Sequence, residues 1–121
     1  MRIALIKEQG GENMKRIMLV CSSGSSTSLL VKKMQEAAQK KGLTDVEIVA
    51  TSQAEAKNHY DDTDVLLLGP QVRYLYNELK KTLAGKKIAL DVINSKDYGT
   101  MNGEAVLEQA LKLAEKKGEG E

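Results

Sequence analysis

The sequence predicts an α/β protein with a four-stranded parallel sheet and helices on both faces. Short continuous apolar runs, typical of strands buried on both faces, alternate along the chain with segments whose apolar residues recur at helical spacing. Such alternation favours parallel strands joined by right-handed helical crossovers. We expect the strand order 2-1-3-4, which puts the switch in strand order at the first strand.

Each predicted element rests on its own pattern of residues. The strands are predicted at residues 17–20, 46–50, 64–69 and 88–93. Apolar residues at helical spacing predict helices over 30–41, 72–83 and about 103–115. Ser52 and Glu55 form a capping box for a short helix reaching about residue 58. Residues 94–102 are predicted to form a loop.

One domain is expected, covering residues 14–117. Residues 1–13 contain Gly10-Gly11 and precede Met14, where the regular pattern begins, so we expect a flexible N-terminal extension. The alternative is a structured edge strand at residues 3–6. The charged, glycine-containing end from Lys116 is expected to fray, leaving residues 118–121 as a tail.

Composition narrows the classes of function. The net charge is +1 and the only aromatic residues are four tyrosines, which argues against a nucleic-acid partner. One cysteine and one histidine cannot form an internal disulfide or a zinc site, and we expect neither metal nor cofactor. The apolar runs are too short for a membrane span or a secretory signal. We therefore expect a cytoplasmic protein, and a monomer because no apolar stripe is left over.

The first strand ends at the single cysteine, Cys21, and a polar stretch leads from it to the next helix. The unpaired N–H groups and dipole of a helix start can hold an anion, and they favour thiolate over thiol. Hydroxyl groups need partners when buried, and a glycine lets the backbone approach a ligand. We predict that Cys21 is a nucleophile that accepts a phosphoryl group. The residues predicted to hold that group are Ser22, Ser23, Gly24, Ser25, Ser26, Thr27 and Ser28.

Three alternatives remain open for this stretch. Cys21 could be a small buried hydrophobe at a strand end, which is common for free cysteine. The stretch could belong to a low-molecular-weight cysteine phosphatase or arsenate reductase, but those loops close with an arginine six positions after the cysteine, and here that position is Thr27. It could also hold the phosphate of a nucleotide or flavin in a non-catalytic binding module.

Two other segments should reach the same edge of the sheet, because ligands of open parallel sheets bind beyond the carboxyl ends of the strands. Pro70 and Gln71 follow the third strand, and Tyr98 and Gly99 follow the fourth; we predict that they form a wall of the site. Pro70 also fits an ordinary helix start. Asp91 is either an acid near Cys21 or a residue that caps a turn. The only histidine, His59, is expected to be structural or exposed.

The chain resembles the IIB component of a sugar phosphotransferase system (PTS) of the lactose/cellobiose/chitobiose family. The resemblance extends over residues 14–117, and the order and spacing of its motifs are specific. The motifs are Met14-Lys15-Arg16-Ile17-Met18-Leu19-Val20-Cys21, Gly24, Ser26-Thr27-Ser28-Leu29-Leu30-Val31-Lys32-Lys33-Met34, Leu68-Gly69-Pro70-Gln71-Val72 and Tyr98-Gly99-Thr100-Met101-Asn102-Gly103.

The resemblance implies a flavodoxin-like fold, similar to that of low-molecular-weight phosphatases. It also implies that Cys21 is phosphorylated by a phosphohistidine of a IIA protein and passes the group to a sugar bound by the membrane component IIC. Residues 22–28 would cradle the phosphoryl group, and the protein would dock at the inner face of the membrane through IIC. Members of the family often carry aspartate where this chain has Asn94, so we assign no acid–base role there.

Overall fold

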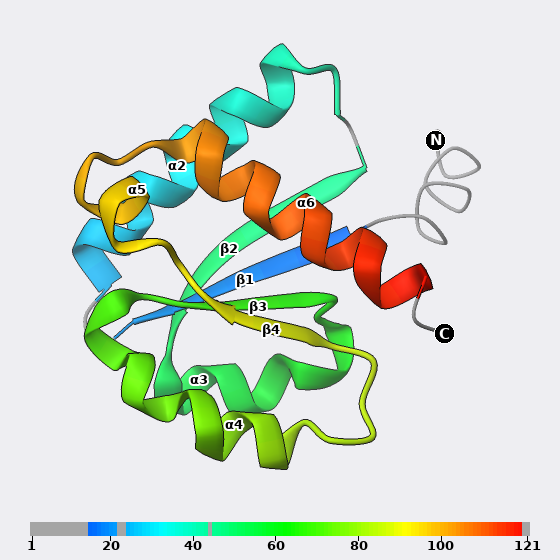
Figure 1. Ribbon diagram of the computed structural model, residues 1–121. Coiled ribbons are helices and arrows are strands. Elements are labelled where there is room, and N and C mark those ends of the chain that lie inside the picture. The colour runs from blue at the N-terminus through cyan, green and yellow to red at the C-terminus, as the bar shows by residue number, and fades with distance from the viewer. Residues whose placement is uncertain (1–14, 22–23, 44, 120–121) are drawn as a thin grey trace.

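The sheet has the predicted topology. The computed structural model describes residues 15–21, 24–43 and 45–119. Its four strands are parallel and lie in the order β2-β1-β3-β4, which confirms the predicted order 2-1-3-4 (Figure 1). The strands are β1 (Lys15–Cys21), β2 (Val46–Ser52), β3 (Val65–Leu68) and β4 (Ala89–Val92). The N-terminal extension predicted for residues 1–13 lies outside the described residues.

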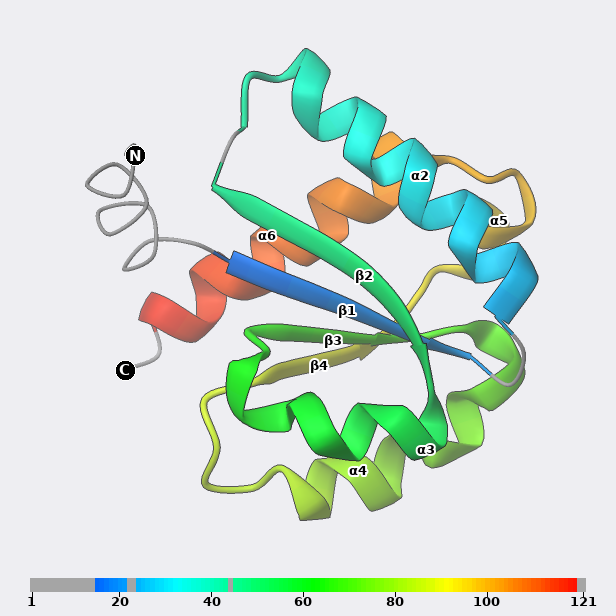
Figure 2. The ribbon, with the colours of Figure 1, turned by 180° about the vertical axis from the view of Figure 1, so that it is seen from behind.

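Helices cover both faces of the sheet. The α-helices α2 (Gly24–Lys40) and α6 (Gly103–Glu119) lie over one face, together with the short α5 (Ser95–Gly99). The other face is covered by α3 (Gln53–Ala56), the 3₁₀ helices η1 (Lys57–Asp62) and η2 (Pro70–Leu75), and α4 (Tyr76–Thr82). Figures 1 and 2 show these two layers from opposite sides.

Side chains of the inner strands alternate between two buried clusters. Ile17 and Leu19 of β1 face the layer that contains α2 and α6, whereas Met18 and Val20 face the layer that contains α3 and α4. All four are at most 1% exposed, which explains why the strand reads as one continuous apolar run. By the same alternation, Cys21 faces the α2 layer.

Several predicted boundaries differ from those observed. The predicted helix at 72–83 begins earlier, as η2, and Val72 (φ −117°, ψ 24°) breaks its helical geometry before α4. The Ser52 cap is confirmed, since its Oγ accepts a hydrogen bond from Glu55 N, but the chain continues from α3 into η1. Helix α6 runs to Glu119, past the point where we expected fraying, and residues 120–121 lie outside the described residues.

The prediction of a loop at residues 94–102 is wrong in part, because this segment contains α5. The side chain of Asn94 accepts hydrogen bonds from the backbone N–H groups of Lys96 (2.9 Å) and Asp97 (3.2 Å). This N-cap satisfies donors that a helix start leaves unpaired. It stabilises a helix of only five residues, which is too short for apolar periodicity to reveal.

Helices α2 and α6 pack so closely at Gly103 that there is no room for a side chain at this position. A Cβ there would lie 2.5 Å from Lys33 C and 2.6 Å from Met34 N, which are backbone atoms of α2. We predict that Gly103→Ala lowers the free energy of unfolding by about 1–3 kcal/mol, because α6 must move away from α2. Urea denaturation measures this change.

The matched control is Gly99→Ala, where a Cβ would meet no atom within 4 Å. It should change the free energy of unfolding by less than about 1 kcal/mol. Equal losses for the two substitutions would contradict the packing argument.

Candidate functional site

Cys21 is the last residue of β1, at the carboxyl edge of the sheet. It is in register with Ser52, the last residue of β2. On its other side, the Gly69 N–H donates to Val20 O at 2.8 Å, which continues the pairing one residue beyond β3. Cys21 is 2% exposed, so bulk water has little access to its side chain. Its position, in an inner strand near the switch in strand order, is where ligands of open parallel sheets bind.

The predicted loop of residues 22–28 is shorter than expected. Helix α2 begins at Gly24, so five of these seven residues belong to the start of a 17-residue helix. Ser22 and Ser23 lie outside the described residues, as do the side chains of residues 25–27, while Ser28 is exposed. The N-terminal end of a long helix therefore follows Cys21 within a few residues. Such a helix end can hold an anion.

Gly69, which the sequence analysis treated only as part of a strand end, makes the closest approach to Cys21. A Cβ at Gly69 would lie 3.4 Å from Cys21 Cβ and 2.7 Å from Gln71 Oε1. Pro70 is half-buried at the start of η2, and Gln71 is exposed. The structure thus brings Gly69, the first residue after β3, against Cys21.

The segment after β4 is joined to this wall through Tyr98. Its ring is buried among core residues of the α2 and α6 layer, and its hydroxyl accepts a hydrogen bond from Gln71 Nε2 at 3.1 Å. Gly99 is exposed, and a Cβ there would meet open space. Gln71 and Tyr98 are therefore in contact, whereas Gly99 lies at the exposed end of α5.

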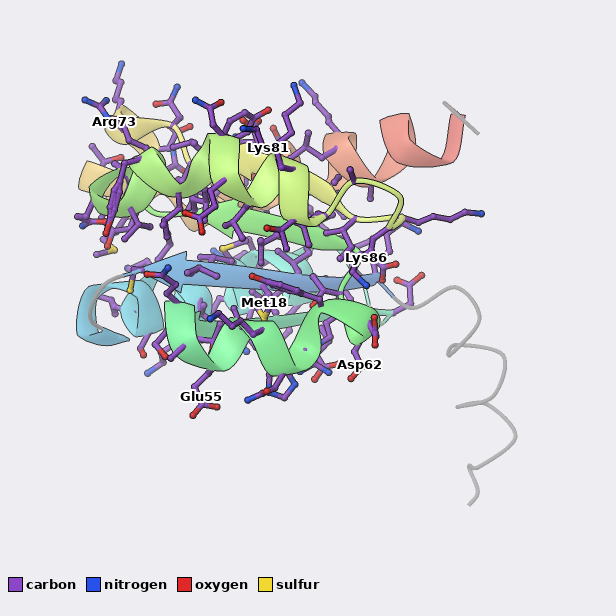
Figure 3. All side chains as sticks on the ribbon, turned by 90° about the horizontal axis from the view of Figure 1, so that it is seen from below. Met18, Glu55, Asp62, Arg73, Lys81 and Lys86 are labelled. Atoms are coloured by element: carbon purple, nitrogen blue, oxygen red, sulfur yellow. The ribbon has the colours of Figure 1, made fainter. Side chains whose placement is uncertain are left out.

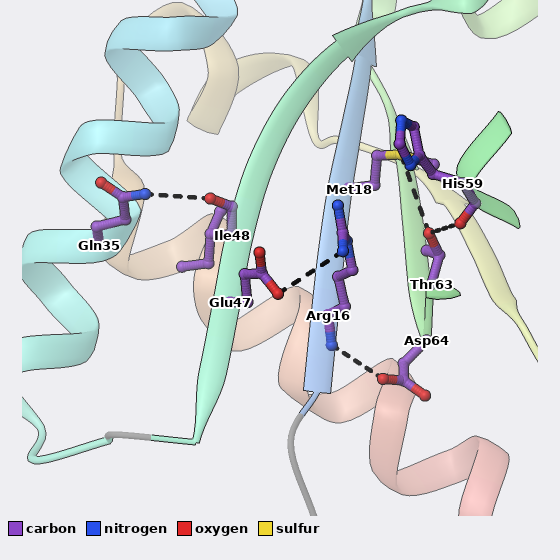
Figure 4. A network of polar contacts seen from close by, with 8 residues as sticks. All are labelled: Arg16, Met18, Gln35, Glu47, Ile48, His59, Thr63 and Asp64. Atoms are coloured by element: carbon purple, nitrogen blue, oxygen red, sulfur yellow. Dashed lines mark hydrogen bonds and ion pairs between the residues drawn. The ribbon is translucent and has the colours of Figure 1, made fainter. Parts of the chain in front are cut away.

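Two other residues considered in the sequence analysis, Asp91 and His59, have contacts or positions that indicate structural roles. Asp91 accepts hydrogen bonds from Val92 N (2.8 Å) and from Gln109 Nε2 of α6 (3.0 Å), which favours the structural interpretation of this residue. His59 lies in η1, which leads into the start of β3 and hence to the edge opposite Cys21. Its carbonyl oxygen accepts a 2.7 Å hydrogen bond from the Thr63 hydroxyl (Figure 4).

Polar contacts gather at that opposite, amino edge. Arg16 N donates to Asp64 Oδ2 at 2.9 Å, and Arg16 Nη1 lies 3.8 Å from Glu47 Oε1 (Figure 4). Nearby, burial raises the pKa of the Tyr60 phenol, with a smaller contribution from the Glu78 carboxylate. Tyr60 therefore stays protonated at neutral pH.

The surface at the carboxyl edge includes residues that the sequence analysis did not single out. Leu29 of α2 is 48% exposed and Tyr74 of η2 is 66% exposed, and both belong to elements that begin at this edge. Figure 3 shows Arg73 at the same end, toward which β1 runs, while Asp62 and Lys86 lie at the other end. Helical periodicity alone could not show that these side chains stay uncovered.

The described residues offer neither a metal site nor a membrane span. Within residues 15–21, 24–43 and 45–119, no three histidine, cysteine, aspartate or glutamate side chains gather closely enough to hold a metal ion. None of the helices in these ranges combines the length and the apolar composition needed to cross a bilayer.

Together, the fold and the site define a flavodoxin-like α/β protein with one cysteine where an inner parallel strand meets a helix start. The family model for the "PTS system, Lactose/Cellobiose specific IIB subunit" matches residues 16–109. The chain therefore belongs to this family and is a IIB component of a sugar phosphotransferase system. The family assignment agrees with the resemblance seen in the sequence. It does not agree with the phosphatase alternative or with the nucleotide-binding alternative.

Individual relatives support the assignment. The chain is 46% identical over 100 residues to the oligo-beta-mannoside-specific EIIB component of Bacillus subtilis, covering 83% of this chain and 96% of the relative. It is also 46% identical over 104 residues to the galactose-specific EIIB component of Lactococcus lactis subsp. cremoris, covering 82% and 95%.

Solved structures show the same fold. The cellobiose-specific IIB component of Borrelia burgdorferi is 38% identical, with a TM-score of 0.72 over 86% of this chain and 94% of that one. The lactose-specific IIB domain of Streptococcus pneumoniae has a TM-score of 0.74 over 82% and 96%, and at 18% identity it supports the fold alone.

The cap at Asn94 should set the stability of α5, which carries Tyr98. We predict that Asn94→Ala lowers the free energy of unfolding by about 1 kcal/mol, because two backbone donors lose their acceptor. Asn94→Asp keeps an acceptor oxygen and should stay close to the parent protein. Denaturation curves measure both, and an aspartate variant as unstable as the alanine variant would refute the capping role.

Proposed function

We propose that Cys21 carries the phosphoryl group of this IIB component. A phosphohistidine of the IIA protein donates the group, and a sugar bound by the membrane component IIC accepts it. The observation that carries the proposal is the position of the only cysteine of the chain. Cys21 ends an inner strand, beside Gly69 and Gln71 and just before the start of α2.

The chemistry is two in-line transfers. In the first, the Cys21 thiolate attacks the phosphorus; the S–P bond forms as the P–N bond to the donor histidine breaks, and the histidine nitrogen keeps the electron pair. In the second, a sugar hydroxyl attacks the same phosphorus and loses its proton, the S–P bond breaks, and the thiolate is regenerated. Such transfers depend mainly on positioning and on charge stabilisation.

A carrier and a phosphatase place opposite demands on water. A phosphatase must bring water to the phosphocysteine, whereas a carrier must keep water away until the partner arrives. The low exposure of Cys21 and the presence of Thr27, where a cysteine phosphatase has arginine, both suit a carrier. Transfer then requires each partner to reach the sulfur from the carboxyl edge.

Sugar specificity is assigned to IIC, within the lactose/cellobiose/chitobiose class. Relatives that share the same 46% identity with this chain are named for oligo-beta-mannoside, for galactose and for cellobiose. This chain thus resembles IIB components named for different sugars to the same degree, as expected if another component selects the sugar. We propose a monomer that works in the cytoplasm and docks on IIC at the inner face of the membrane.

Partners are proposed to dock on the carboxyl edge through Leu29 and Tyr74. Exposed large apolar side chains around a reactive group are typical of contact surfaces, and aromatic anchors often dominate their affinity. The contact must be brief, which favours a small interface.

Incubation with phosphorylated IIA should add one phosphoryl group to the protein, at Cys21. Intact-mass analysis followed by peptide mapping measures the addition and its position. Cys21→Ser should abolish it, because a serine hydroxyl remains protonated and is a poor nucleophile at neutral pH. A phosphoryl group found elsewhere, or one that survives in Cys21→Ser, would refute the proposal.

Docking through Leu29 and Tyr74 predicts that their substitution changes the affinity for IIA and not the rate of transfer once IIA is bound. Leu29→Ser and Tyr74→Ser should each raise the IIA concentration needed for half-maximal transfer by about tenfold. Each substitution removes an apolar contact whose burial contributes roughly 1.5 kcal/mol or more to the binding free energy. The rate at saturating IIA should change little. Stopped-flow transfer assays separate the two parameters.

The control for docking is Asp62→Ser, an exposed position at the opposite end of the molecule (Figure 3). It should leave both kinetic parameters unchanged. Unaltered transfer in Leu29→Ser and Tyr74→Ser would place the docking surface elsewhere.

A further inference from the structure

Strands β2 and β4 form the two edges of the sheet that the structure describes, in the order β2-β1-β3-β4. Along a strand, the backbone groups of successive residues point to opposite sides. Every second residue of an edge strand therefore directs its N–H and C=O groups away from the sheet. A row of such groups is a template on which a strand of another molecule can pair. The contacts of the outward residues thus decide whether this sheet can be extended.

On β4, the outward residues are those with even numbers. Ala89 N and Ile93 N donate to the carbonyl oxygens of residues 64 and 68, at 2.9 and 2.8 Å, so the odd-numbered residues face β3. Val92 therefore directs its backbone N–H and C=O groups toward the open side of the strand.

Side chains bond both outward groups of Val92. Its N–H donates to Asp91 Oδ1 at 2.8 Å, and its carbonyl oxygen accepts a hydrogen bond from Gln109 Nε2 of α6 at 3.0 Å. Gln109 Nε2 also donates to Asp91 Oδ2 at 3.0 Å, so both N–H donors of the carboxamide are used. Two acceptors at one end of the carboxamide require the nitrogen there, which fixes its orientation. The three residues form one network along the β4 edge.

The β2 edge is covered in a similar way by the other long helix of the same layer. Asp45 O accepts a hydrogen bond from Lys15 N of β1 at 2.9 Å, so the odd-numbered residues of this segment face β1 and Ile48 points outward. The Ile48 carbonyl oxygen accepts a hydrogen bond from Gln35 Nε2 of α2 at 3.1 Å (Figure 4). A glutamine from each long helix therefore bonds an outward carbonyl group, on opposite edges of the sheet.

The carboxamide of Gln109 is not explained by packing. Its Oε1 atom is buried and has no hydrogen-bond partner among the described residues. A buried acceptor without a partner is unfavourable, and an unbranched apolar side chain of similar length would avoid it. The nitrogen end of the carboxamide, however, bonds the β4 edge, which an apolar side chain could not do.

We propose that Gln35 and Gln109, together with Asp91, close the two edges of the sheet against a strand of a second copy and so keep the protein a monomer. An incoming strand can pair at Ile48 or at Val92 only after these side-chain hydrogen bonds break. Edge closure rests on the monomeric state given in the proposed function, and it names the groups that maintain that state.

Methionine substitutions open the edges with little change in volume, because methionine is unbranched, is similar in length to glutamine and has a similar helix propensity. The double variant Gln35→Met/Gln109→Met loses both carboxamides. Gln39→Met is the matched control, since it adds the same apolar side chain at an exposed position of α2. Sedimentation velocity at increasing protein concentration measures self-association.

The double variant should self-associate at concentrations at which the parent protein stays a monomer, with an association constant at least about tenfold higher, because opened edges offer hydrogen bonds to a second copy. In amide spectra of ¹⁵N-labelled double variant, the backbone signals of Ile48 and Val92 should shift with concentration. Gln39→Met should behave as the parent protein. Equal association of this control, or a double variant that stays a monomer wherever the parent does, overturns the proposal.

Lysine substitutions separate edge closure from a loss of stability. Gln35→Lys/Gln109→Lys removes the same two carboxamides, but charged side chains beside an edge strand also oppose pairing. This variant should therefore stay a monomer. Association as strong as that of the methionine variant would show a general effect of losing the glutamines and would overturn the proposal.

The parent protein provides a test that needs no variant. The side-chain N–H groups of Gln35 and Gln109 should exchange with solvent several-fold more slowly than those of Gln39, because their hydrogen bonds must open first. Equal exchange rates at all three positions overturn the proposal, whether or not the variants fold.

The outcomes also separate edge closure from phosphoryl transfer. If the double methionine variant stays a monomer while Cys21 accepts a phosphoryl group, edge closure fails and the carrier function stands. If that variant associates while the parent protein takes no phosphoryl group at Cys21, the carrier function fails and edge closure stands. A parent protein that itself associates through Ile48 or Val92 overturns edge closure and the proposed monomer together.

Discussion

The site depends on the pairing of β1 with a parallel strand on each side. Both edges of β1 are bonded, to β2 and to β3, and both of its faces are covered by helices. Cys21 therefore lies where an inner strand leaves the sheet. The pairing extends past β3 through the bond from Gly69 N–H to Val20 O, and this bond brings the Gly69 segment against Cys21.

This dependence makes the register of β3 as important as the identity of the cysteine. Val20 pairs with Leu68, so the residue that follows Leu68 is the one that reaches Cys21. A shift of one residue would bring a side chain into the place of Gly69 and would exchange the two faces of the strand. The burial of Leu66 and Leu68 on one face, and of Val65 and Leu67 on the other, prevents such a shift.

Much of this arrangement could be predicted from the sequence, because it follows from long patterns. Continuous apolar runs predicted the strands, and the polar stretch after Cys21 indicated the edge that carries the candidate site. The contact between Gln71 and Tyr98 could not be predicted, since it depends on the rotamer of a surface side chain and on a five-residue helix. The exposure of Leu29 and Tyr74 also depends on how neighbouring elements cover each helix, which periodicity does not specify.

The groups that the structure places against Gly69, beside Cys21, are neutral, which agrees with the demands on a carrier under the proposed function. Gly69, Gln71 and Tyr98 bring dipoles but no formal charge, whereas Arg73 lies exposed at the outer side of η2. A buried cation beside the sulfur would stabilise the bound phosphoryl group as well as the transition state, and such uniform binding does not speed its departure. Under the proposed function, neutral dipoles at fixed positions would stabilise the group in transit and still let it leave, as two successive transfers through one sulfur would require.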